Sequence, residues 1–107
     1  MAAYNLHPYF PYPAIKDGVV VAGQAITVTS TATKQFAAFA VDTDTVVFDV
    51  QTASVWCTFD TSTPATGAAH ILSAGLAYQM SKAAATAAKF VATTTTNAVL
   101  YASEFRT

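Results

Sequence analysis

The sequence has very little charge. Charged residues make up 10% of its 107 positions, against roughly 25% in an average globular domain. The formal net charge is −1, and the basic residues are spread along the chain at Lys16, Lys34, Lys82, Lys89 and Arg106. Nucleic-acid binding needs Lys and Arg gathered against the phosphates. We therefore expect no nucleic-acid partner.

Cysteine and long apolar runs are also scarce. Cys57 is the only cysteine, so no disulfide can form within the chain, and we expect a protein held together by packing or association in a reducing cytosol. No run approaches the roughly 18 to 20 apolar residues that cross a bilayer, and the first residues lack the pattern of a secretion signal. The sequence predicts a soluble, unprocessed chain with no membrane partner.

The sequence is rich in hydrophobic residues. Hydrophobic residues make up 53% of it, which together with the low charge is the opposite of the disorder signature. The length suits a single domain with one core. Small domains bury a smaller fraction of their surface than large ones. We therefore expect some of the apolar surface to contact a partner.

The first seventeen residues differ from the rest. They combine aromatic residues with three of the four prolines, at Tyr4, Pro8, Tyr9, Phe10, Pro11, Tyr12 and Pro13. Proline fixes φ and removes a backbone donor, so the pattern predicts an extended arm over residues 1–17, followed by a domain over 18–107. Because aromatic rings gain free energy by leaving water, these seven residues are candidate protein-interface residues. The arm packs either on its own domain or on a neighbouring subunit, and the sequence leaves both open.

After Gly18 the pattern becomes that of short strands. β-branched residues prefer a pleated surface, and alternation such as Val46, Phe48 and Val50 indicates one buried face. We expect strands at 19–21, 25–29, 35–41, 45–51, 54–59, 70–74, 76–81, 89–93 and 98–105. Residues 52–53 suit a tight hairpin or a bent strand, the last two strands a closing hairpin, and 82–89 a single turn or a loop. This predicts an all-β fold, an antiparallel β-sandwich or jelly roll.

Residues suited to nucleophilic catalysis are few. Cys57 and His70 could form a nucleophilic pair. However, Cys57 shares its alternating face with Val55 and Phe59, which favours a buried, inert thiol. We therefore expect no enzyme.

Four aspartates could suggest a hard-cation site. Calcium prefers several carboxylate and carbonyl oxygens, but the spacing of Asp42, Asp44, Asp49 and Asp60 fits no recognised ligand loop. Turn and strand positions account for them. We expect no metal and no cofactor.

Trp56 has two interpretations. It falls on the face opposite Val55 and Cys57, which favours a second wall of the core in a strand covered on both sides. The alternative is an exposed interface anchor, a role in which tryptophan is enriched. Trp56 is therefore a further candidate protein-interface residue.

The segment from Val55 to Gly75 resembles a pattern in small structural proteins of tailed bacteriophages. The shared features are a strand ending in Phe59-Asp60, a loop rich in Thr and Pro, a Gly, a strand beginning His70-Ile71-Leu72 and a further Gly. Thr61 and Ser62 stand where the family usually has glycine. The resemblance implies a β-sandwich on the virion, often trimeric, that binds capsid or tail proteins and has no catalytic residues.

The composition and the resemblance together lead to one expected function. We expect a capsid cement or decoration protein, made in the bacterial host cytoplasm and carried on the capsid surface of the virion. Its expected partners are the major capsid protein and further copies of itself, with a trimer favoured. The alternatives are a head-completion, tail or fibre-associated protein, a carbohydrate-binding β-sandwich using Trp56 or the arm tyrosines, and a hydrolase built on Cys57 and His70.

Overall fold

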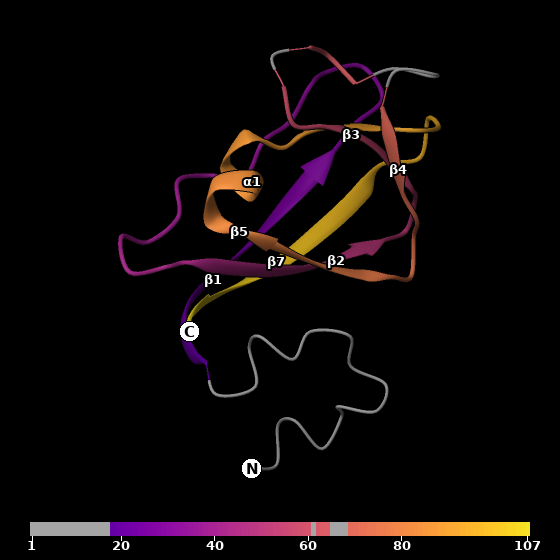
Figure 1. Ribbon diagram of the computed structural model, residues 1–107. Coiled ribbons are helices and arrows are strands. Elements are labelled where there is room, and N and C mark those ends of the chain that lie inside the picture. The colour runs from indigo at the N-terminus through magenta and orange to yellow at the C-terminus, as the bar shows by residue number, and fades with distance from the viewer. Residues whose placement is uncertain (1–17, 61, 65–68) are drawn as a thin grey trace.

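The computed structural model describes residues 18–60, 62–64 and 69–107. The predicted arm, with its seven candidate interface residues from Tyr4 to Pro13, lies outside the described residues. Figure 1 shows the arrangement of the elements in the described part. These elements are β1 (Val19–Val28), β2 (Thr45–Gln51), β3 (Val55–Thr58), β4 (His70–Leu72), β5 (Ala77–Ser81), α1 (Lys82–Ala87), β6 (Lys89–Ala92) and β7 (Ala98–Arg106).

The strands form two antiparallel sheets, which confirms the predicted all-β class. One sheet has four strands in the order β1-β7-β2-β5, and the other has three in the order β4-β3-β6. Strand β1 begins where β7 ends, because Val19 pairs with Arg106. The start of β1 therefore lies beside the end labelled C in Figure 1.

Neither predicted hairpin forms, although the strands themselves exist, and residues 52–54 interrupt the bent continuous strand that was the alternative at 52–53. β2 belongs to the four-stranded sheet and β3 to the three-stranded one, so residues 52–54 carry the chain from one sheet to the other. Thr52 has a positive φ of 76° at this crossing. The strands β6 and β7 are likewise in different sheets. Alternating strand patterns show which side chains are buried, but not which strand is the partner.

The strand predicted over 35–41 does not form. Only Lys34 makes an isolated bridge, to Phe90 of β6. The side chain of Gln24 instead holds this extended segment: its Oε1 accepts from the backbone N–H of Ala37 at 2.8 Å, and its Nε2 donates to the Ala37 carbonyl at 3.1 Å. A side-chain amide thus replaces a strand partner, and Phe36 is placed in the core. The two predicted strands at 19–21 and 25–29 are one strand, with a register shift between Val20 and Ala22.

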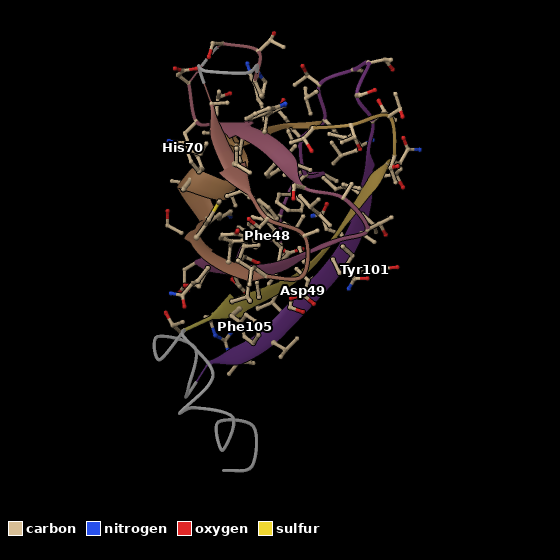
Figure 2. The ribbon with its side chains drawn as sticks, turned by 90° about the vertical axis from the view of Figure 1, so that its right-hand side faces the viewer. Phe48, Asp49, His70, Tyr101 and Phe105 are labelled. Carbon is tan, nitrogen blue, oxygen red and sulfur yellow. The ribbon has the colours of Figure 1, made fainter. Side chains whose placement is uncertain are left out.

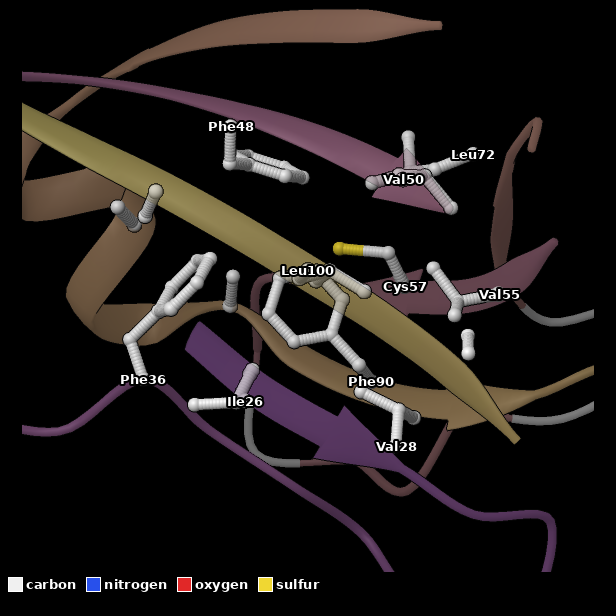
Figure 3. Close-up of a cluster of buried hydrophobic side chains, with 14 of the residues drawn as sticks. Ile26, Val28, Phe36, Phe48, Val50, Val55, Cys57, Leu72, Phe90 and Leu100 are labelled. Atoms are coloured by element: carbon white, nitrogen blue, oxygen red, sulfur yellow. The ribbon is translucent and has the colours of Figure 1, made fainter. Parts of the chain in front are cut away.

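The inner faces of the two sheets contribute to one core, shown in Figure 3. Its centre is a set of three phenylalanines from three parts of the chain. The Phe36 ring lies 5.3 Å from the rings of both Phe48 and Phe90, edge to face, and the rings of Phe48 and Phe90 are 5.9 Å apart. Such edge-to-face pairs add to the free energy gained by burial. Phe48 and Phe90 are both fully buried.

Residues 82–87 form a short helix, where the sequence predicted a turn or loop over 82–89. The hydroxyl of Ser81 accepts from the backbone N–H of Ala84 and so caps its first turn. Ala85 is buried against the core, so packing supplies what six residues lack in intrinsic helix stability. No helix in the described part of the chain is long and apolar enough to cross a membrane.

Candidate interaction surfaces

Trp56 lies on the outer face of the three-stranded sheet, not in the core. Its neighbours Val55 and Cys57 are fully buried, and the alternation along β3 turns the indole to the other side. Directly opposite it across the strands are Ile71 of β4 and Val91 of β6. Cross-strand partners share a face, so Ile71, Trp56 and Val91 form one apolar row, here called the Trp56 row. The predicted second core wall is therefore not observed.

The Trp56 row is accessible. The side chain of Ile71 is 55% exposed, and Trp56 and Val91 are half-buried. The row runs across all three strands of the sheet and contains no charged residue. A central tryptophan flanked by aliphatic side chains is the composition typical of an interface anchor.

The outer face of the four-stranded sheet is a second surface, which the sequence analysis missed. Strand register brings Val20 opposite Phe105, Ala25 opposite Tyr101, and Tyr101 opposite Asp49. Figure 2 shows Asp49, Tyr101 and Phe105 on these neighbouring strands. Val20 and Tyr101 are 66% and 50% exposed. The apolar residues of this outer face are Val20, Ala25, Val47, Ala77, Val99, Tyr101 and Phe105.

This face has almost no charge. Between the Val20–Phe105 pair and the Thr27–Val99 pair, Asp49 is the one charged residue at an outward position of the four paired strands. The rest are small, hydroxyl, amide or apolar side chains. The sequence could not reveal the surface, because the alternation along one strand does not show which strands lie beside it. The strand order in the sheet also differs from the order along the chain.

Cys57 and His70 are Cα partners in the pairing of β3 with β4. Cys57 is fully buried, and burial raises the pKa of its thiol from 9.0 to about 11. The thiol therefore stays protonated at neutral pH, which does not suit a nucleophile. His70 is exposed, and its ring lies 5.9 Å from the ring of Phe59. His70 and Phe59 line an open pocket of about 410 Å³ together with Thr58, Asp60 and Ala69.

The four aspartates do not converge on one site in the structure. Asp44 binds the backbone N–H and hydroxyl of Thr107, Asp60 binds Ser62, and Asp42 is 4.0 Å from the Arg106 guanidinium. Asp49 lies on the outer sheet face described above. Within residues 18–60, 62–64 and 69–107, no three His, Cys, Asp or Glu side chains come together as a metal site.

Comparison of the chain with protein-family models, with curated proteins and with solved structures found no match.

Proposed function

We propose that this chain is a bacteriophage capsid cement protein: a β-sandwich, possessing the jelly-roll character its sequence suggests, that binds the major capsid protein on the assembled shell. The observation that carries the proposal is the Trp56 row, an accessible apolar row on a sheet face with its tryptophan at the centre. The charge-poor composition supports it, because surfaces that stay covered in an assembly need little charge for solubility.

The mechanism is linkage. A protein that binds the assembled shell and not the free subunits stabilises the shell by mass action. Each copy adds buried area across a joint between capsid subunits, and copies joined in an oligomer bind with an increased effective concentration. No chemical step is involved. In this proposal Trp56 enters a pocket between capsid subunits, and Ile71 and Val91 exclude water around it.

A carbohydrate-binding module is the second candidate, because an outward tryptophan can stack on a sugar ring. Sugar sites surround such a ring with polar groups that fix the hydroxyls. The cross-strand neighbours of Trp56 are instead Ile71 and Val91. These aliphatic flanks favour a protein partner.

The experiment measures binding of the purified chain to shells of the phage that encodes it, assembled without the chain. We expect saturable binding and a higher melting temperature of the shell. Trp56→Ala lowers the affinity about 30-fold or more, as expected for an anchor worth at least about 2 kcal/mol. Leu76→Ala is the matched control, because Leu76 is 54% exposed and lies outside the row; it leaves binding unchanged.

Two results would overturn the proposal: wild-type chain that ignores the shells, or folded Trp56→Ala that binds as well as the wild type. Mass spectrometry of purified virions adds the copy number. A high copy number per particle fits a cement protein, whereas a low one favours a head-completion, tail or fibre protein. Binding on a glycan array, lost in Trp56→Ala, would select the carbohydrate-binding candidate.

A further inference from the structure

We propose that the outer face of the four-stranded sheet binds residues 4–13 of a second copy of this chain, so that the oligomer is built by exchange of arms. The inference rests on the self-association included in the proposed function and names its surface and its occupant. It uses the sheet face opposite to the one assigned to the capsid. The two assignments can therefore fail separately.

The size of the face argues for an arm. Four strands spaced about 4.8 Å apart, over roughly eight residues at 3.4 Å each, present a footprint of about 500 Å². A stable interface buries about 800 Å² on each partner. Two such faces pressed together would bury only one face on each chain. Reciprocal exchange of arms covers one face and one arm on each chain, and each aromatic residue of an arm buries roughly 150 to 250 Å².

The chemistry of the two surfaces matches. Residues 1–15 contain no Asp, Glu, Lys or Arg, and the face has the single charge of Asp49. Neither surface therefore has to desolvate several charges on binding. Tyr4, Tyr9 and Tyr12 also carry hydroxyl donors. The face offers Asp49, Gln51 and Ser103 as acceptors at outward positions.

Three prolines suit the arm to a side-chain surface. Proline has no backbone donor, so Pro8, Pro11 and Pro13 are poorly suited to extending the sheet through a strand edge. A segment lying across the outward side chains does not need those donors. Proline also stiffens the arm, which lowers the entropy lost when it is ordered.

The place where the arm joins the domain favours binding of the arm to the face of a second copy over binding to the face of its own domain. Val19 pairs with Arg106 at the end of the sheet, and β1 runs away from the arm along the sheet edge. An arm that covered its own face would have to reverse direction between residue 13 and Val19. Seventeen residues reach at most about 60 Å, whereas the ten residues of β1 span about 33 Å. The segment before β1 is therefore long enough to extend beyond the sheet.

The test is chemical cross-linking between two differently tagged chains, one carrying Asn5→Cys and the other Ser103→Cys, with a short bismaleimide. Ser103 is exposed on the face, and the native Cys57 is buried. We expect a covalent heterodimer in which mass spectrometry finds positions 5 and 103 joined. Thr95→Cys, exposed in the β6–β7 loop, replaces Ser103→Cys as the control and gives at least a tenfold lower yield. A doubly substituted chain that cross-links only within itself at every concentration overturns the proposal.

Light scattering supplies the second measurement. We expect deletion of residues 2–13 and Tyr101→Glu each to reduce the mass in solution to that of one chain, with the sheet spectrum retained. Ile71→Glu, on the opposite sheet, keeps the oligomer. An unchanged mass in the deletion variant overturns the arm exchange. A monomeric chain that binds shells would overturn this inference alone. An oligomer that does not bind shells would overturn the proposed function alone.

Discussion

The buried carboxylate of Glu104 accepts a hydrogen bond of 2.9 Å from the hydroxyl of Thr43. The same oxygen accepts from the backbone N–H of Ala40 at 2.8 Å, and Lys82 Nζ donates to the Ala40 carbonyl at 3.1 Å. Glu104 and Thr43 are 3% and 4% exposed. This network holds residues 40–43, which precede β2, against strand β7. Strand β7 is the neighbour of β2 in the sheet.

Loss of the Glu104 side chain should therefore destabilise the fold. Glu104→Ala leaves the buried Thr43 hydroxyl and the part-buried Ala40 N–H without an acceptor, and we expect the free energy of unfolding to fall by about 2 to 3 kcal/mol. Glu104→Gln keeps an acceptor oxygen and should lose less than half of that. Urea unfolding followed by circular dichroism measures both. Equal stability of Glu104→Ala and the wild type would show that the network contributes nothing.

The buried thiol predicts a loss of stability in alkali. Burial raises the pKa of Cys57 from 9.0 to about 11. Because the unfolded chain loses this proton first, the contribution is complete below about pH 9 and is lost as the pH rises through 11. Two pKa units correspond to about 3 kcal/mol. Unfolding measured from pH 7 to 11 should show the stability advantage of the wild type over Cys57→Ala shrinking with pH; a constant difference would contradict the assignment.

The lowered pKa of Asp44 predicts a loss of stability at acid pH. The backbone N–H of Thr107, followed by the hydroxyl of Thr45, lowers the pKa of Asp44 below its usual 3.8. A lowered folded-state pKa stabilises the fold above the ordinary value, and this contribution is lost as the pH falls through the lowered one. Thr107→Pro removes the N–H donor and should raise the Asp44 pKa in a carboxyl NMR titration. Thr107→Val, which keeps that donor, should raise it less; no change in Thr107→Pro would refute the cause.

The backbone at Thr52, where the chain crosses between the sheets, is strained, and a substitution should relieve the strain. Thr52 has a φ of 76°, a region that β-branched residues rarely adopt. Thr52→Gly should raise the melting temperature, with a gain of about 1 kcal/mol. The exposed Thr95 is the control, and Thr95→Gly should bring no gain. In the converse change, Gly75→Ala at a φ of 86° with no atom near its Cβ should lose about 1 kcal/mol. A lower melting temperature in Thr52→Gly would mean that the residue is not strained.

Local patterns predicted most of the strands in the described part of the chain. The expected strand over 45–51 coincides with β2, and Val46, Phe48 and Val50 are buried as their alternation indicates. The inertness expected of Cys57 follows from the same alternation, and the structure buries it fully. These properties depend on the side-chain period of two along a strand, which the sequence itself contains.

Only the tertiary structure decided how the strands pair and which surfaces result. Trp56 faces outward because β3 contributes just one side to the core, and the sequence does not state how many sides of a strand are covered. The segment 35–41 has a strand-like composition, yet the Gln24 amide occupies the place of a strand partner. The outer face of the four-stranded sheet exists because β1, β7, β2 and β5 meet in an order different from that of the chain. Pairing is settled by the packing of distant segments around a shared core, and no local pattern encodes that competition.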